Sequence, residues 1–206
     1  MVKLAGPLMS LDASGSIAGA ITFSKWKGRN YARQLVQPAN PRSVLQVSTR
    51  AMLKFLSQDW INVGATPQGS WADRAAQTNI SPFNAYIAAN MSRWRQFQAP
   101  AQTDPAPETG TLPVAVLTSA TGGPSYIDLL LTLTTISDCW GVMLFQSSTG
   151  TFTPSRANCI AVLPFTATVT YTVSGLVAGA YFFDAKFFTK EGALGPDEGE
   201  VTASAT

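Results

Sequence analysis

A proline-rich stretch at residues 98–113 separates two parts of this chain that follow different hydrophobic patterns. Before it, apolar residues recur at helical spacing; after it, the period changes to two and turns come about every ten residues. The stretch QAPAQTDPAPETGTLP holds four prolines and no apolar periodicity, which is typical of a stiff, extended spacer. We therefore expect one domain, with an N-terminal arm, at residues 1–97, a linker at 98–113 and a second domain at 114–206.

The charge of the chain is divided in nearly the same way. Residues 1–100 carry eleven Lys and Arg against three acids, a net charge of +8, whereas residues 101–206 carry three against nine, a net charge of −6. The whole-chain value of +2 hides this division. It predicts that the two halves meet different surroundings, or each other's counterparts in neighbouring subunits.

The N-terminal part begins with a predicted β-hairpin. Two runs rich in β-branched and aromatic residues, 21–27 and 31–36, flank a turn at residues 28–30. Both faces of the first run mix polar and apolar side chains. Because a lone hairpin of this kind is marginal in water, we expect this arm to need a partner.

Three capping signals predict a small three-helix unit after the hairpin. The first helix should run from residue 43 to about residue 60, and the other two should begin near residues 70 and 81. The signals are Asn40 with Pro41, Ser70 with Asp73, and Ser81 with Pro82. The large aromatic residues of this part are expected to be core or interface anchors.

The part after the linker predicts an all-β, immunoglobulin-like sandwich, so the chain as a whole belongs to the α+β class with two domains. Seven short strands in fewer than a hundred residues are typical of such a sandwich. The expected strands are 114–119, 126–135, 140–146, 159–163, 169–173, 180–188 and 199–203.

One segment of this part resembles the fibronectin type III family. In residues 171–183 a strand ends at Gly175-Leu176, and Gly179-x-Tyr181 opens the next strand. Residues 192–196, GALGP, resemble that family's loop before its last strand. The sequence departs from the family on the second strand, where leucines stand in place of the usual tryptophan and Trp140 lies on the following strand.

The composition argues against an enzyme. The chain has no His and only two Cys, so Ser-His-Asp and Cys-His catalysis and zinc sites that use His are excluded. Cys139 and Cys159 are expected to be buried thiols in a reducing compartment. No apolar run reaches the roughly 18 residues of a membrane helix, and no targeting signal is evident, so we expect a soluble protein that contacts no membrane.

No catalytic, cofactor-binding or metal site is predicted, and no cofactor is expected. The glycine-rich residues 14–19 lack the spacing of a phosphate-binding loop, so a flexible arm is the favoured interpretation. Asp197, Glu198 and Glu200 form an acidic loop without the spacing of a calcium site, and a solvated loop is favoured there.

The hairpin supplies the candidate functional site, because cations alternate there with aromatic residues. We interpret it, together with two arginines that follow it, as a protein interface. Its residues are Lys25, Trp26, Lys27, Arg29, Tyr31, Arg33, Arg42 and Arg50. The same mixture of charge and aromatic rings is used on single-stranded nucleic acid, so a nucleic-acid-binding protein is the alternative.

The N-terminal part also resembles a family of tailed-bacteriophage virion structural proteins of unassigned role, over residues 15–95. The matching pattern is Gly19-x-x-x-Phe23-Ser24-x-x-x-Gly28-Arg29-x-Tyr31-x-Arg33, then Val36-x-Pro38-x-Asn40-Pro41, Gln46, Arg50, Trp71-x-x-x-Ala75 and Pro82-Phe83-Asn84-Ala85-Tyr86-x-x-x-Asn90. Several members carry a proline-rich linker and an immunoglobulin-like domain.

The resemblance implies a particle component located in the virion and assembled in the host cytoplasm. Its partners would be capsid, neck or tail subunits, and it would form a homo-oligomer within a symmetric assembly. A third possibility is a virion carbohydrate-binding adhesin, in which Phe152 or Phe188 stacks on sugar rings.

Overall fold

The structure is a computed structural model that describes residues 2–4, 15–17, 20–36, 40, 42–109, 115–133, 139–164, 167–197 and 199–206. Its elements confirm the predicted fold class: an N-terminal hairpin, three helices and an antiparallel β-sandwich. The chain forms two compact units, Met1–Pro41 and Arg42–Thr206. They divide near residue 41 and not at residues 98–113, so the helices and the sandwich belong to one unit.

The N-terminal unit contains a four-stranded antiparallel sheet in the order β1-β4-β3-β2. Its strands are β1 (Val2–Leu4), β2 (Gly15–Ile17), β3 (Ile21–Trp26) and β4 (Arg29–Gln34). The predicted hairpin is the β3–β4 pair, joined by Lys27 and Gly28, whose φ angles are 48° and 76°. The turn is therefore shorter than expected, with Arg29 already paired in β4 opposite Trp26. Two consecutive positive φ values match the twist of the strands, and Gly28 adopts one without strain.

The second unit begins with the helices α1 (Val44–Asp59), α2 (Ala65–Thr78) and α3 (Pro82–Arg95), with the 3-10 helix η2 (Trp60–Asn62) after α1. The start of α3 is as predicted, since the Ser81 hydroxyl accepts a hydrogen bond from the Asn84 backbone N–H at 3.2 Å. Helix α1 occupies nearly the expected range, but Ser43 and not Asn40 precedes it. Arg42 has a φ of 48°, which interrupts any helical path from Asn40, and Pro41 lies outside the described residues.

The predicted start of α2 at Ser70 is wrong. The helix begins five residues earlier, after Gly64, and Pro67 lies in its first turn, where the missing N–H costs no intrahelical bond. Ser70 is instead inside the helix. Its hydroxyl donates to the Pro67 carbonyl at 2.7 Å and accepts a hydrogen bond from the Asp104 backbone N–H at 3.0 Å.

The sandwich consists of two antiparallel sheets, β11-β10-β7-β8 and β5-β6-β9. Their strands are β5 (Ala115–Gly123), β6 (Tyr126–Leu133), β7 (Cys139–Ser147), β8 (Cys159–Pro164), β9 (Thr168–Ser174), β10 (Gly179–Thr189) and β11 (Val201–Ala205). Every predicted strand is present among the described residues. The ends differ by up to four residues; β5 extends furthest beyond its predicted range because it stays paired with β6 as far as Gly123.

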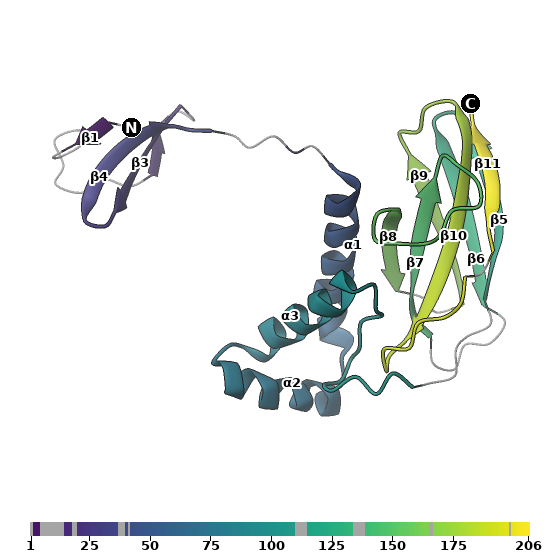
Figure 1. Cartoon of the computed structure of the whole chain (residues 1–206), viewed down its shortest axis with the longest axis horizontal. Helices are drawn as coiled ribbons and strands as arrows, with labels where there is room; N and C mark the ends of the chain where they lie inside the picture. Colours follow the sequence, from purple (N-terminus) through teal and green to yellow (C-terminus); the bar gives the residue numbers. More distant parts are fainter. Residues whose placement is uncertain are drawn as a thin grey trace. The chain divides into compact units, whose positions relative to one another are not determined.

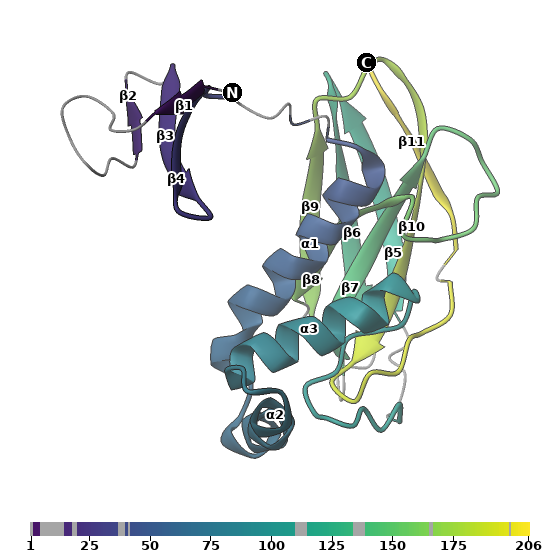
Figure 2. The same ribbon diagram turned by 60° about the vertical axis from the view of Figure 1, so that its left-hand side comes forward.

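Helices α1 and α3 pack against the sheet that contains β7 and β8, so this unit has three layers (Figures 1 and 2). Strand β7 is buried on both faces. Val142 and Leu144 pack in the sandwich interior, whereas Trp140 and Phe145 pack with the helices. In the core between the helices and this sheet, the Phe55 ring of α1 lies 5.0 Å from the Trp140 ring, centroid to centroid. Two cores therefore share one sheet.

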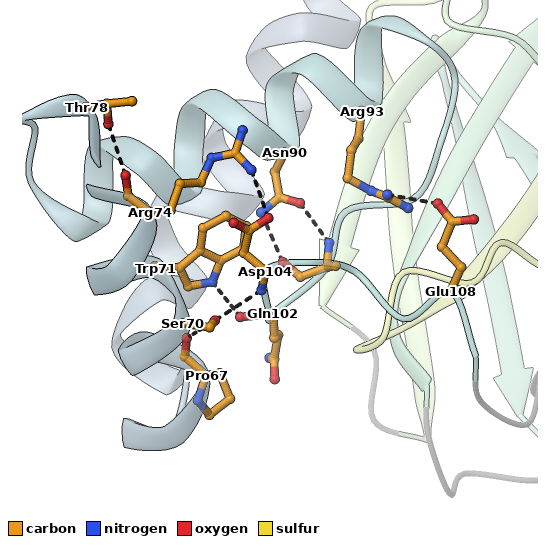
Figure 3. Close-up of polar contacts among 11 residues, drawn as sticks. Pro67, Ser70, Trp71, Arg74, Thr78, Asn90, Arg93, Gln102, Asp104 and Glu108 are labelled. Carbon is orange, nitrogen blue, oxygen red and sulfur yellow. Dashed lines mark hydrogen bonds and ion pairs between the residues drawn. The ribbon is translucent and has the colours of Figure 1, made fainter. Parts of the chain in front are cut away.

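Residues 98–104 are buried or half-buried against the helices and do not form the extended spacer that we predicted (Figure 3). Ala99 and Ala101 are fully buried, and the Asn90 side chain binds both the N–H and the carbonyl of Ala101, at 2.7 and 3.0 Å. The Trp71 indole donates to the Gln102 carbonyl at 2.6 Å. The low side-chain volume of this stretch lets it lie against the helices while buried polar partners satisfy its backbone. Residues 110–113 of the predicted linker lie outside the described residues.

The same segment neutralises part of the basic charge assigned to the N-terminal half. Arg74 of α2 pairs with Asp104 at 2.8 Å, and Arg93 of α3 pairs with Glu108 at 2.9 Å (Figure 3). Counted by compact unit, residues 1–41 have five Lys and Arg against one Asp, a net charge of +4, and residues 42–206 have nine against eleven acids, a net charge of −2. The charge contrast is therefore smaller than expected, and the excess of positive charge lies in the N-terminal unit.

Candidate functional site

The eight residues of the predicted interface fall in both compact units. Six lie in the N-terminal unit, on β3, β4 and the turn between them. Arg42 and Arg50 belong to the second unit, just before and within α1. We therefore describe two surfaces, the hairpin face and the α1–β8 groove.

The hairpin face is the side of the β3–β4 pair on which Trp26, Arg29, Tyr31 and Arg33 lie. The register sets Trp26 opposite Arg29, Ser24 opposite Tyr31 and Thr22 opposite Arg33. Directly paired residues share one face of a sheet and successive residues alternate, so these side chains gather on one side. Lys25 pairs with Asn30 and occupies the opposite face.

This face is exposed and carries a cation–aromatic contact. Trp26 has 66% of its surface exposed, and the Lys27 ammonium lies 5.0 Å from the centroid of its ring. Arg29 and Arg33 are exposed and form no ion pair with any residue that the structure describes. An exposed indole with Arg29 paired opposite it and the Lys27 ammonium over its ring suits a surface that loses water only when a partner covers it.

The α1–β8 groove is a cleft of about 360 Å³ in the second unit. Apolar side chains line most of it, including Val47 and Ala51 of α1 and residues 160–163 of β8, and Tyr171 of β9 closes one side. Arg42, Arg50 and Lys54 line its remaining wall. Burial, with a smaller effect from Cys159, raises the pKa of Tyr171, so its phenol remains neutral.

Sequence reasoning identified Arg42 and Arg50 but missed Lys54 and the apolar part of the groove. The signal for Lys54 was its spacing of four residues from Arg50, which puts both side chains on one face of a helix. The contribution of β8 and β9 had no such signal, because it depends on the helices packing against the sandwich.

A buried polar cluster lies at the end of α1, and its contacts are internal. The Asp59 carboxylate accepts hydrogen bonds from the Trp140 indole at 2.8 Å and from the Gln102 amide at 3.5 Å. Burial and the nearby Asp59 charge raise the pKa of Tyr86 far above its usual range. Because Trp140 and Gln102 donate to Asp59 from other elements, this cluster connects layers of the fold. It offers no exposed reactive group.

The two cysteines are free and buried, as predicted. Burial raises the pKa of each thiol from 9.0 to about 12, and hydrogen bonds to the backbone lower it less. Thiols of this kind are poor nucleophiles at neutral pH because almost none is present as thiolate.

The described residues do not support the weaker candidate sites. Phe188 is fully buried and Phe152 is half-buried against the helix-facing core, so neither offers a ring for sugar stacking. Asp197 pairs with Lys186 at 2.6 Å, whereas Glu198 lies outside the described residues. Of the glycine-rich residues 14–19, the described part, Gly15–Ile17, is strand β2.

Among the described residues, no group of three or more His, Cys, Asp and Glu side chains is placed to hold a metal ion. None of the helices in the described ranges has both the length and the hydropathy needed to cross a membrane.

Comparison with known proteins gives distant structural matches alone. No family model and no curated protein matches the sequence. A β-1,2-glucanase from Parabacteroides distasonis matches with a TM-score of 0.40 and 17% identity, over 50% of this chain but 14% of that enzyme. An Fn3-like protein from Clostridium thermocellum matches with a TM-score of 0.36 and 16% identity, over 47% of this chain and 93% of that protein. A superoxide reductase from Ignicoccus hospitalis matches with a TM-score of 0.30 and 11% identity, over 42% of this chain and 73% of that chain.

The C-terminal part of the chain is a β-sandwich of two antiparallel sheets, as its alternating strands and its turn residues predicted. These matches carry no information about activity or partners.

Proposed function

We propose that this chain is a structural component of a tailed-bacteriophage particle, either a capsid decoration protein or an accessory protein of the neck or tail. It docks on other virion proteins through its basic N-terminal sheet and presents the Fn3-like sandwich. It acts without catalysis or cofactor, and it forms a homo-oligomer within the symmetry of the particle. The sequence resemblance over residues 15–95 to phage proteins of unassigned role supports this class.

The observation that carries the docking role is the exposure of the N-terminal sheet. Among its residues whose side chains are described, none is buried, and the largest, Trp26, has 66% of its surface exposed. A sheet needs a buried apolar face to be stable by itself, and this one has none among those residues. A partner that covers one face would supply the missing burial.

The net charge of +4 on residues 1–41 favours an acidic surface on that partner. Arg29, Arg33 and Trp26 would lie at the centre of such an interface, since large aromatic and arginine side chains often dominate binding energy. The fused helices and sandwich would then project from the attachment point as one body.

Mass spectrometry of purified particles tests the proposal. We expect the chain at a copy number that matches a symmetric position, and its absence from purified particles would contradict the proposal. In particles assembled with the Trp26→Ala/Arg29→Ala/Arg33→Ala variant, incorporation should fall by at least tenfold. Lys190→Ala, which removes an exposed cation from the second unit, is the matched control and should be incorporated normally.

Nucleic-acid binding is the second candidate, because the register gathers Trp26, Tyr31 and two arginines on one face. Stacked bases and phosphates would suit that arrangement. A filter-binding titration with single-stranded DNA at increasing salt separates the two functions. If DNA is the partner, affinity should fall steeply with salt and be lost when Lys25, Lys27, Arg29 and Arg33 are changed to Ala. Weak binding that these four substitutions leave unchanged favours the protein partner.

A further inference from the structure

The two lateral sides of the sandwich differ in how they are closed. On the β5–β11 side, the Thr206 backbone N–H donates to the Gly123 carbonyl at 3.1 Å, and the Ser125 N–H donates to the Thr206 carbonyl at 3.0 Å. A side chain at Gly122 would overlap the Ser204 carbonyl oxygen, so the strands are in close contact there. This side has no room for another strand.

The other side lacks such closure in the part of the chain that the structure describes. Strand β8 is the edge of its sheet and pairs with β7 only, and β9 is the edge of the other sheet and pairs with β6 only. Edge strands present unpaired backbone groups, which a further strand can satisfy. Helix α1 lies beside β8 here (Figure 2). Residues of α1, β8 and β9 line the α1–β8 groove.

The lining of the groove combines apolar and cationic side chains. Residues 160–163 of β8 and Val47 and Ala51 of α1 provide apolar surface. Among the described residues that line the groove, the charged ones are the cations Arg42, Arg50 and Lys54. Arg42 and Lys54 are exposed and form no ion pair with the described residues. A ligand for this groove must therefore combine apolar and negatively charged groups.

We propose that the α1–β8 groove binds an acidic, extended segment of a partner protein, which adds as a strand to the edge of β8. Main-chain hydrogen bonds to an edge strand would hold the segment. Its apolar side chains would face the apolar wall, while its carboxylates meet the cations of α1. Side chains of a strand alternate in direction, so a segment with alternating apolar and acidic residues presents each kind of side chain on its own face.

This surface is separate from the hairpin face, and the proposal goes beyond the docking role. Four residues of β8 line the groove, so a segment of roughly four to six residues spans it at about 3.3 Å per residue. Of the described residues in the lining, Tyr171 alone carries an aromatic ring, and it is half-buried. A protein segment is therefore favoured over nucleic acid, which uses several exposed rings.

Fluorescence anisotropy with the full-length chain tests the proposal. The probe is a fluorescein-labelled, capped octapeptide of alternating valine and glutamate. Comparison peptides replace glutamate with lysine, replace valine with serine, or carry N-methyl groups on alternate residues, so that one hydrogen-bonding edge is lost. We expect the valine–glutamate peptide to bind and each comparison peptide to bind at least tenfold more weakly. We also expect its affinity to fall with rising salt.

A pair of charge-reversal variants locates the binding surface. Arg42→Glu/Lys54→Glu should weaken binding of the valine–glutamate peptide at least tenfold, because both substitutions reverse the charge that meets its carboxylates. Arg29→Glu/Arg33→Glu makes the same charge change on the hairpin face and should leave affinity unchanged. Circular dichroism checks that both variants keep the fold.

Several results would overturn the proposal. Equal binding of the lysine or the N-methylated peptide would exclude an acidic added strand. A loss of affinity in the hairpin variant alone would assign the peptide to the other surface. Displacement of the labelled valine–glutamate peptide by an oligo-dT of the same net charge would assign the groove to nucleic acid. Self-association of the chain that Arg42→Glu/Lys54→Glu abolishes would make a second copy the occupant.

Discussion

The Trp140 indole N–H donates a hydrogen bond of 2.8 Å to the Asp59 carboxylate, and both residues are buried. This bond joins the end of α1 to the beginning of β7, across 81 positions of sequence. The Trp140 ring also packs against Phe55 of α1 and Phe188 of β10. Trp140 is thus one of the residues that join the helical layer to the sandwich.

Replacing Asp59 with Leu should lower the free energy of unfolding by about 1–3 kcal/mol, because the Trp140 N–H would remain buried without an acceptor. Asp59→Asn should cost less, since an amide oxygen still accepts the bond. Urea unfolding followed by tryptophan fluorescence measures both. Asp73→Asn, on the exposed face of α2, is the control and should change stability by less than about 0.5 kcal/mol. Equal stability of Asp59→Leu and Asp73→Asn would show that the buried bond contributes nothing.

Replacing Asn90 with Ala should release residues 98–109 from α3. The substitution removes both hydrogen bonds to Ala101 in a fully buried site, at a cost of about 2–4 kcal/mol. Hydrogen exchange at the amides of residues 99–104 should become faster, and limited proteolysis should cut within the segment. Asn84→Ala replaces an exposed asparagine of the same helix and should leave both measurements unchanged. Unchanged exchange in Asn90→Ala would mean that other contacts suffice to hold the segment.

The sequence predicted the strands of the sandwich because their alternation and turn residues are local signals. It did not predict that the helices and the sandwich share a core. The available signal was residues 139–145, CWGVMLF, an apolar run that is typical of a strand buried on both faces. The proline content of residues 98–113 pointed to a spacer. The decisive contacts of that segment, such as those of Asn90 and Trp71, depend on tertiary packing and have no local pattern.

The sequence likewise predicted which residues form the hairpin part of the candidate site, but not how they are arranged. The composition of the hairpin identified its cations and aromatic rings, but the register decides which of them share a face. That register moved the turn to Lys27 and Gly28 and put Lys25 on the side opposite Trp26. The α1–β8 groove is formed by helix α1 and by the edge strands β8 and β9. The strand residues follow the helix residues by more than a hundred positions, so residue pattern alone does not reveal the groove.

The two thiols should be inert in the folded chain. Because burial raises the pKa of Cys139 and of Cys159 to about 12, Ellman's reagent at pH 8 should label neither cysteine until denaturant is added. After denaturation two thiols should react. Rapid labelling of either cysteine in the native chain would contradict the burial described for it.

The same pKa shifts predict a loss of stability in alkali. Above about pH 9 the unfolded chain releases the thiol protons while the folded chain keeps them, so the free energy of unfolding falls as pH rises toward 12. Each thiol should contribute a slope of about 1.4 kcal/mol per pH unit in that window. Urea titrations between pH 8 and pH 11 measure the slope. The slope should be less steep in Cys139→Ala/Cys159→Ala. Part of the slope should remain in this variant, because the pKa of Tyr86 is also raised.

Deleting residues 1–41 should leave the second unit folded, because both hydrophobic cores consist of residues that follow Arg42. The free energy of unfolding should fall by less than about 0.5 kcal/mol, so the thermal midpoint should move by no more than about 2 °C. Circular dichroism of the 42–206 chain measures this, and Asp59→Leu in the same chain shows that the assay detects a loss of packing. A truncated chain that is unfolded at room temperature would show that the N-terminal sheet supports the helices. If the truncated chain folds, supplying it during phage assembly tests the docking proposal separately. It should then be absent from purified particles, because the surface proposed to attach it has been removed and the remaining unit is intact.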